Sequence, residues 1–165
     1  MIKVLIGYYS RTGNTKKMAD FVAKAVLDEG AEVSVKPVTE ILPDELISYD
    51  GIILGSPTYY GLPAAEVKKL LDESVILHGK LDGKVGGAFT SSGNLGGGNE
   101  TTILAIIEAF LIHGMIIQGT SKNDHYGPVA IGAPDKRAEK QCHELGKRVV
   151  RLIKKICVIT PAKNA

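Results

Sequence analysis

Tryptophan is absent from the 165-residue chain, and cysteine occurs only twice. Cys142 and Cys157 lie fifteen residues apart in a segment with helical periodicity, so their Cα atoms would be separated by roughly 22 Å. A disulfide requires Cα atoms within about 7 Å of each other. The scarcity and spacing of cysteine therefore argue against a disulfide scaffold and favour a cytoplasmic protein with reduced thiols. No spacing of His and Cys suggests a metal site.

Long hydrophobic runs are also missing. The most apolar stretch, Ile103 to Ile117, is interrupted by Glu108 and His113, whereas a membrane-spanning helix needs about 20 apolar residues. The N-terminal residues MIKVLIGYYS include no small-residue cleavage site, so they predict a first strand and not a signal peptide. The net charge of +2 gives no general indication of nucleic acid or a membrane surface as a partner.

The near-neutral charge hides an asymmetry between the two ends of the chain. Residues 1–134 carry a balance of −4, and residues 135–165 carry a balance of +6. A predicted last helix over 136–156 has one apolar face and one basic face. The basic face is formed by Arg137, Lys140, Lys147, Arg148, Arg151, Lys154 and Lys155. Two interpretations stay open for this face: a solvated helix exterior, or a docking surface for an acidic partner or a phosphate-bearing ligand.

Short apolar runs alternate with longer amphipathic segments along the chain. The apolar runs predict strands at 2–8, 33–38, 51–55, 84–90 and 115–118. The amphipathic segments predict helices at 14–29, 64–73, 101–112 and 136–156, with a short helical piece at 43–47. Such alternation is typical of a parallel sheet covered by helices on both faces. We expect one domain over 1–156 and a loose tail over 157–165.

Glycine is present in excess, at 19 of 165 positions, without a collagen-like period or a low-complexity tract. Many of these glycines fall in the loops that follow the predicted strands. In a parallel α/β sheet, ligands bind outside the carboxyl ends of the strands. These loops are therefore the place to look for a binding site.

The first such loop joins the first strand to the first helix and reads S-R-T-G-N-T. Its residues are Ser10, Arg11, Thr12, Gly13, Asn14 and Thr15. Backbone N–H groups and the dipole at a helix N-terminus attract an anion, and Ser and Thr hydroxyls can donate further hydrogen bonds. An ordinary N-cap would need only one Ser, Thr or Asn. Four such residues among six favour a phosphate-monoester site over a simple cap.

The second loop follows the third strand and reads S-P-T-Y-Y-G. It contains Pro57, Thr58, Tyr59, Tyr60 and Gly61. The two tyrosines could stack on a planar heterocycle, and the neighbouring glycines would let the backbone approach a flat ligand. The alternative is a turn that carries two surface tyrosines.

The same strand ends exclude a competing protein class with this topology. A phospho-acceptor receiver domain needs an acidic pocket for a divalent metal at the ends of its first and third strands. Here the first strand ends in Tyr8 and Tyr9, and the third ends in Gly55, Ser56 and Pro57. The chain is therefore not a receiver domain.

The third loop follows the fourth strand and reads T-S-S-G-N-L-G-G-G-N-E. Residues 86–98 hold six of the glycines, so this segment offers many backbone donors and acceptors with little side-chain bulk. Neither G-x-G-x-x-G nor G-x-x-x-x-G-K-[ST] occurs, which excludes a dinucleotide fingerprint and a Walker A loop. Together, the three loops predict a site for a mononucleotide with a large planar ring.

The motifs S-R-T-G-N-T, G-S-P-T-Y-Y-G and F-T-S-S-G-N-L-G-G-G-N-E-T-T resemble those of the flavodoxin-like FMN proteins. The chain is most similar to the WrbA-type NAD(P)H:quinone oxidoreductases, which also share the later segments H-G-M and H-Y-G-P at 113–115 and 125–128. The resemblance covers residues 2 to about 155. It implies a three-layer, doubly wound α/β fold with a five-stranded parallel sheet in the order 2-1-3-4-5.

The resemblance also implies which residues hold FMN. Residues 10–15 would bind the phosphate, and residues 57–61 would lie along the isoalloxazine ring. The residues expected to line the polar edge of the ring are Ser91, Ser92, Gly93, Asn94, Gly96 and Gly97. His125 is expected at the cofactor, and Tyr60, His125 and Tyr126 are the candidates for catalytic contacts.

In the family, NAD(P)H reduces the flavin, which passes two electrons to a quinone-like acceptor. We therefore expect an FMN-dependent oxidoreductase that assembles as a dimer or tetramer, since family tetramers use neighbouring subunits to wall the flavin site. A flavodoxin-type electron carrier without its own substrate stays open, because residues 1–134 are acidic. A flavin-binding protein with a regulatory role stays open as well.

The sequence departs from the WrbA pattern in two places. Ile112 stands where the family motif H-H-G-M has its first His, so His113 matches the second and is expected in the interior or at an interface. The segment 74–79 is shorter than the family's insertion toward the substrate. These departures concern the quinone pocket more than the FMN site.

Overall fold

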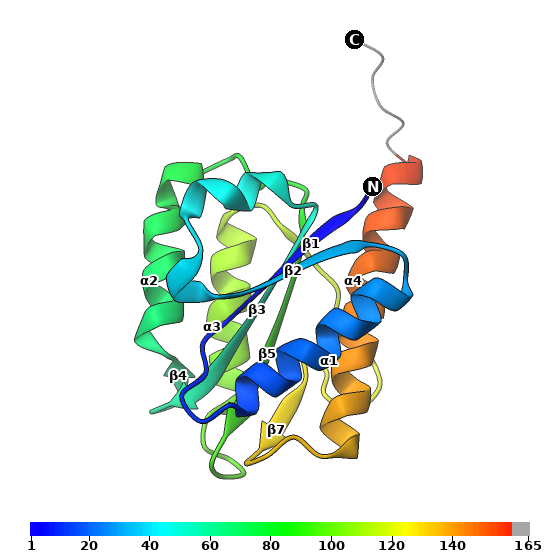
Figure 1. Cartoon of the computed structure of the whole chain (residues 1–165). Helices are drawn as coiled ribbons and strands as arrows, with labels where there is room; N and C mark the ends of the chain where they lie inside the picture. The colour runs from blue at the N-terminus through cyan, green and yellow to red at the C-terminus, as the bar shows by residue number, and fades with distance from the viewer. Residues whose placement is uncertain (160–165) are drawn as a thin grey trace.

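A parallel sheet forms the middle layer of the computed structural model, which describes residues 1–159 (Figure 1). Strand β1 (Lys3–Tyr8) lies between β2 (Glu32–Pro37) and β3 (Gly51–Tyr59), and β5 (Val85–Ser92) follows on the far side of β3. All these pairings are parallel. The order β2-β1-β3-β5-β6 confirms the predicted arrangement of five strands.

The edge of the sheet beside β5 differs from the prediction. The expected strand at 115–118 is reduced to β6 (Ile116–Ile117), which pairs only with the beginning of β5. A second short strand, β7 (Val129–Ile131), pairs with the end of β5. With β4 (Leu62–Pro63) antiparallel to β3, the sheet has seven strands where five were predicted.

Helices cover both faces of the sheet. Helices α1 (Asn14–Asp28) and α4 (Lys136–Ile159) pack on one face, and α2 (Ala65–Glu73) and α3 (Asn99–Ile112) on the other (Figure 1). Three 3₁₀ segments complete the connections: η1 (Val38–Glu40), η2 (Pro43–Ser48) and η3 (Ser74–Leu77). Within the described residues, none of the helices is long and apolar enough to cross a membrane.

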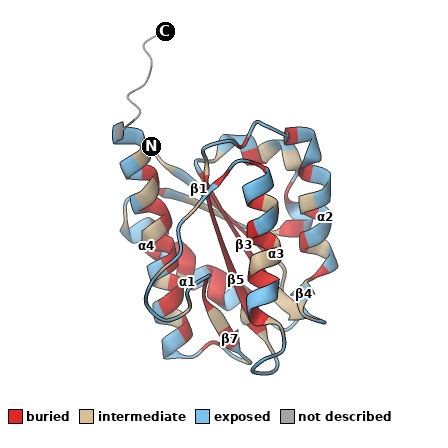
Figure 2. Ribbon diagram, turned by 180° about the vertical axis from the view of Figure 1, so that it is seen from behind, coloured by how far each residue is buried: buried red, intermediate tan, exposed pale blue. Residues whose placement is uncertain are grey.

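The strands of the sheet are largely buried (Figure 2), and the alternation of side chains along them divides the core into two halves. Val4 and Ile6 point to the α1–α4 side, and Leu5 points to the α2–α3 side; all three are fully buried. Such two-sided burial explains why the strands read as continuous apolar runs. It also fixes the register that brings the strand ends to one edge.

Helices α1 and α4 approach closely at Gly146. A Cβ at this position would lie 2.7 Å from the Val22 carbonyl oxygen and 3.0 Å from the Ala25 Cβ. The helix α4 continues through Ile159, three residues beyond its predicted end. Residues 160–165, the rest of the predicted tail, lie outside the described residues. Both cysteines are free thiols, with Cys142 buried and Cys157 exposed.

Candidate functional site

The three loops singled out in the sequence lie at one edge of the sheet. Strands β1, β3 and β5 are neighbours and run in the same direction, so their carboxyl ends lie side by side. Tyr8 is paired with Gly55, and Pro57 is paired with Ser91. The loops therefore form the lower edge of the molecule in Figure 1, where α1 and α3 begin.

The first loop leaves the N-terminus of α1 open. Gly13 caps the helix with a φ of 93°, and no side chain caps the first turn. Ser10 Oγ accepts the N–H of Gly13 at 3.1 Å, while Arg11 and Thr12 are exposed and Asn14 is half-buried. The remaining N–H groups of the first turn are available to an anion. No atom lies within 4 Å of where a Gly13 Cβ would be, so the helix end is accessible.

A buried contact joins the first loop to the third. Thr15 Oγ1 and Ser91 Oγ are 2.9 Å apart, and their residues are 1% and 5% exposed. Thr15 and Ser91, both predicted to contact the ligand, thus hydrogen-bond to each other. This hydrogen bond holds the first loop next to the third loop.

The second loop forms a two-residue hairpin between β3 and β4. Thr58 is paired with Pro63 and Tyr59 with Leu62, which leaves Tyr60 and Gly61 as the turn. Their φ values of 51° and 77° are those of a type I′ turn. Tyr60 is fully exposed, and Tyr59 is 37% exposed. The hairpin therefore presents two aromatic rings to solvent at the edge of the candidate site. Tyr60 is not a glycine, so its left-handed backbone conformation costs about 1 kcal/mol.

The third loop exposes its backbone. Gly93, Asn94, Gly96 and Gly97 are exposed, and Ser92 Oγ donates to the Asn94 carbonyl at 2.8 Å. No atom lies within 4 Å of the positions that Cβ atoms would take on Gly93 and Gly96. A planar ring edge could therefore approach these peptide groups directly.

The segment 118–128 brings His125 and Tyr126 to the same edge. The N–H of Thr90 donates to the Pro128 carbonyl at 3.0 Å, which anchors the segment to the end of β5. His125 Nδ1 lies 2.9 Å from the Thr120 carbonyl, and both His125 and Tyr126 are exposed. The Asp124 carboxylate stabilises this segment: it accepts a hydrogen bond from the Val129 N–H at 2.9 Å and forms a salt bridge with Arg137.

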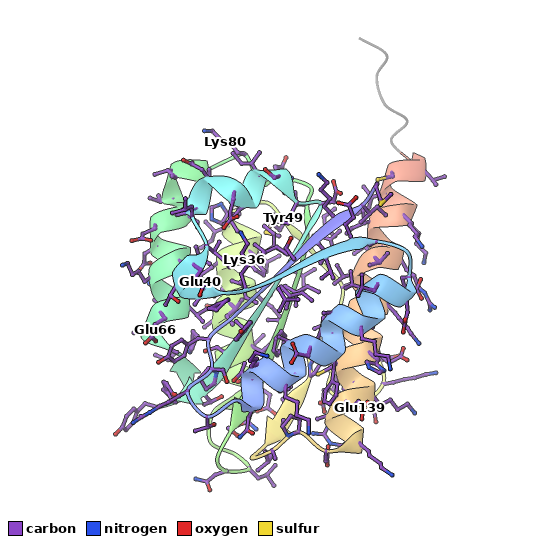
Figure 3. All side chains as sticks on the ribbon, viewed as in Figure 1. Lys36, Glu40, Tyr49, Glu66, Lys80 and Glu139 are labelled. Carbon is purple, nitrogen blue, oxygen red and sulfur yellow. The ribbon has the colours of Figure 1, made fainter. Side chains whose placement is uncertain are left out.

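Several polar residues at this edge escaped the sequence analysis. A hydrogen bond to the Glu66 carboxylate, together with partial burial, raises the pKa of the Tyr9 phenol. Glu66 belongs to α2 (Figure 3), so the contact links the end of β1 to this helix. Asn99 Oδ1 is buried without a partner at the start of α3. The hydroxyls of Thr90, Thr101 and Thr102 bond to the second loop. The third motif contains Thr90 near its start and N-E-T-T at its end, but nothing in it indicated these hydrogen bonds.

A cavity of about 590 Å³ lies elsewhere, along α2 and α3. His113 lines it and is buried as expected, with Nε2 2.8 Å from Ser74 Oγ; burial lowers its pKa. Helix α3 has 14 residues, so about 20 Å of helix separates His113 from the third loop. The uncapped helix end and the open peptide groups lie at the loops and not at this cavity, so the loops are the candidate site.

These residues fit a mononucleotide with a planar ring. The open N-terminus of α1 suits a phosphate, the exposed hairpin tyrosines suit stacking, and the accessible peptide groups of the third loop suit a polar ring edge. Among residues 1–159, no group of three or more His, Cys, Asp or Glu side chains could hold a metal ion.

Comparisons with known proteins agree with this geometry. A family model described as a flavodoxin domain matches residues 5–104. A flavodoxin from Aquifex aeolicus is 39% identical and covers 93% of this chain and 88% of its own. An NAD(P)H dehydrogenase (quinone) from Archaeoglobus fulgidus is 33% identical and covers 95% of this chain and 100% of its own. Among solved structures, the WrbA-like flavodoxin from Agrobacterium tumefaciens has a TM-score of 0.80 at 26% identity, covering 94% of this chain and 99% of that one.

Proposed function

The chain belongs to the flavodoxin family, and from this premise we propose that it binds FMN at the loop cluster and passes two electrons from NAD(P)H to a quinone-like acceptor. One observation carries the proposal: an exposed tyrosine hairpin, an uncapped helix N-terminus and an open glycine backbone meet at the same sheet edge. FMN, when bound, would accept a hydride and release the electrons.

The protein's own residues would bind and orient the cofactor. The first-turn N–H groups of α1 and the hydroxyls of Ser10 and Thr12 would hold the phosphate. Tyr59 and Tyr60 would cover a face of the ring, and the peptide groups of residues 91–97 would bond to its polar edge. His125 and Tyr126 would border the space left for nicotinamide and acceptor.

The relatives support an enzyme and keep the carrier as the second candidate. The relative from Archaeoglobus fulgidus, named NAD(P)H dehydrogenase (quinone), aligns over its whole length. The relative from Aquifex aeolicus, named flavodoxin, is more identical to this chain, and this favours a flavodoxin-type carrier as the alternative. The two candidates share the FMN site and differ in whether NAD(P)H reacts directly with the protein.

We also propose that the protein acts in the cytoplasm as a homo-oligomer. The thiols of Cys142 and Cys157 are unbridged, and burial raises the pKa of Cys142 to about 12, so this thiol is unreactive. Several large apolar side chains are exposed on the segments that border the α2–α3 cavity, and exposed apolar patches are typical of protein interfaces. These residues are Leu62, Val75, Ile76, Leu111 and Ile112.

An anaerobic titration distinguishes the two candidates. The protein is loaded with FMN, and NADH or NADPH is added while the flavin absorbance near its visible maximum is followed. An enzyme loses this absorbance within the assay and regains it when benzoquinone is added. If neither nicotinamide bleaches the flavin while dithionite does, the enzyme proposal is wrong and the carrier stands.

The phosphate position is tested by Thr12→Glu. The new carboxylate would lie at the uncapped end of α1, where it would repel a phosphate and compete for the same N–H groups. We expect FMN affinity to fall by about 30- to 150-fold, since a lost charged contact costs roughly 2–3 kcal/mol. Flavin content after gel filtration measures this, with Thr12→Ser as the matched control. An unchanged content in Thr12→Glu would remove this loop from the site.

A further inference from the structure

The second and third loops are in direct backbone contact at two glycines. A Cβ built on Gly98 would lie 2.4 Å from the Cα of Gly61. Thr101 Oγ1 lies 2.6 Å from the Gly61 carbonyl and 2.9 Å from the Gly98 carbonyl, so it bonds at the point of contact. The hairpin that carries Tyr60 is therefore held on the first turn of α3.

A chain of threonine hydroxyls lies behind this contact. Thr102 Oγ1 is 3.0 Å from Thr58 Oγ1, which is 3.0 Å from Thr90 Oγ1. Thr90 donates to the Ser56 carbonyl at 2.7 Å. Thr102 Oγ1 also lies 2.9 Å from the Gly98 carbonyl, so its one proton is shared between Gly98 and Thr58. Thr90 donates to Ser56, so Thr58 donates to Thr90. The chain connects α3, β3 and β5.

Both ends of this chain of threonine hydroxyls are inaccessible to water. Thr90 and Thr102 are fully buried, so water cannot replace a lost partner. Thr101, in contrast, is exposed, and its bond to Gly61 can be removed without opening the core. The hold of α3 on the hairpin can therefore be tested at an exposed residue, Thr101, and at a buried one, Thr102.

We propose that Thr101 and Thr102 are positioning residues, which preset the Tyr59–Tyr60 face of the cofactor site before FMN arrives. The inference rests on the proposed FMN site. Tyr60 has a strained φ of 51° and packs against little of the chain, so an unheld hairpin would sample other conformations. When the hairpin is already held in place, FMN binding does not have to order it, and the loss of conformational entropy on binding is smaller. Thr101 acts through Gly61, and Thr102 acts through Thr58.

The first experiment needs no cofactor. Amide hydrogen exchange of residues 59–62 is compared in flavin-free wild type, Thr101→Val and Thr101→Ser. We expect Val to speed exchange of these amides about fivefold, because one hydrogen bond is worth about 1 kcal/mol. Ser, which keeps the hydroxyl, should stay near wild type. Ser48→Ala, an exposed hydroxyl at the opposite edge of the sheet, is the control and should change nothing at 59–62.

The second experiment measures the site itself. FMN is titrated into Thr101→Val and Thr102→Val, and both the Kd and the fluorescence of bound FMN at saturation are recorded. We expect the Kd to rise about tenfold in each variant, with bound FMN more fluorescent because the tyrosine rings quench it less. Thr101→Ser and Thr102→Ser should restore both values, which a purely structural loss would not explain.

The outcomes separate this inference from the function it rests on. If wild type fails to bind FMN, the proposed function is wrong, while the exchange data still decide whether Thr101 holds the hairpin. If wild type binds FMN and Thr101→Val and Thr102→Val retain its Kd and its quenching, the positioning role is overturned. Unchanged exchange at 59–62 in Thr101→Val would overturn it as well.

Discussion

At the scale of the residue, Tyr60 shows a conflict between local backbone preference and the site. It occupies the first position of a type I′ turn, where Asn, Asp or Gly is preferred. Because the sequence has Tyr-Gly in place of Asn-Gly, the hairpin could not be predicted, although both tyrosines were identified as stacking candidates. Strain under a fully exposed ring is typical of a functional position.

The substitution Tyr60→Asn should separate stability from binding. Asn tolerates a positive φ and creates the preferred Asn-Gly turn, so we expect the thermal midpoint of the flavin-free protein to rise by about 2–3 °C. The FMN Kd should rise at the same time, since the stacking ring is lost. Tyr59→Asn, at an extended position, removes a similar ring and should give no stability gain. A midpoint that falls in Tyr60→Asn would show that the ring packs against the chain after all.

At the scale of the element, the α1–α4 pair depends on contacts that the sequence only partly reveals. The apolar stripe of α4 was predicted, but its close approach to α1 at Gly146 was not, because a mid-helix glycine carries no sign of its partner. The basic face of α4 is partly engaged. Arg151 and Lys154 bond to Glu29 at the end of α1, which pins the two helices together.

The Glu29 contact predicts a pH-dependent difference in stability. The hydrogen bond from Arg151 lowers the pKa of Glu29 despite partial burial. The folded pKa is below the unfolded one, so the stabilisation is present at neutral pH and is lost as the pH falls through the usual carboxyl range toward the folded pKa. Glu29→Gln should therefore lower the thermal midpoint by about 1–3 °C at pH 7, because the pair is partly exposed.

Thermal melts at pH 7 and pH 3 test this sign. The deficit of Glu29→Gln should shrink at pH 3, where wild type has lost much of the same contribution. Asp28→Asn, at an exposed neighbouring carboxylate, is the matched control and should show no comparable deficit. A deficit that stays the same at both pH values would mean that packing of the side chain, and not its charge, stabilises the helix pair.

Short elements and long-range hydroxyl contacts were the parts of the fold and site that sequence reasoning missed. Two- and three-residue strands such as β6 and β7 carry no readable period, and their pairing with β5 is set by the tertiary structure. The threonine chain joins positions 58, 90 and 102, which only the fold brings together. The loops could be predicted because each follows its strand directly.

At the scale of the whole molecule, the doubly wound topology accounts for most of what could be predicted. Strongly buried strands and amphipathic helices predicted a parallel sheet covered on both faces, and the resemblance to the flavodoxin-like FMN proteins implied the strand order that the structure has. The rule that ligands bind at the carboxyl ends of parallel strands predicted the place of the candidate site. The outer surface of α2 and α3 could not be predicted in the same way. Leu111 and Ile112 on this surface are apolar, yet both are exposed.

This exposed surface leads to a prediction about assembly. Ile112 is 74% exposed at the rim of the α2–α3 cavity, so a lysine there should leave the fold intact but place a charge in an apolar contact between copies. We expect Ile112→Lys to weaken self-association by at least about tenfold, measured as the molar mass from light scattering over a dilution series. Leu27→Lys, at a 58% exposed position on α1, is the matched control and should keep the wild-type mass. If wild type is monomeric at every concentration, or if Ile112→Lys keeps the wild-type mass throughout the series, copies of the chain do not meet through this surface.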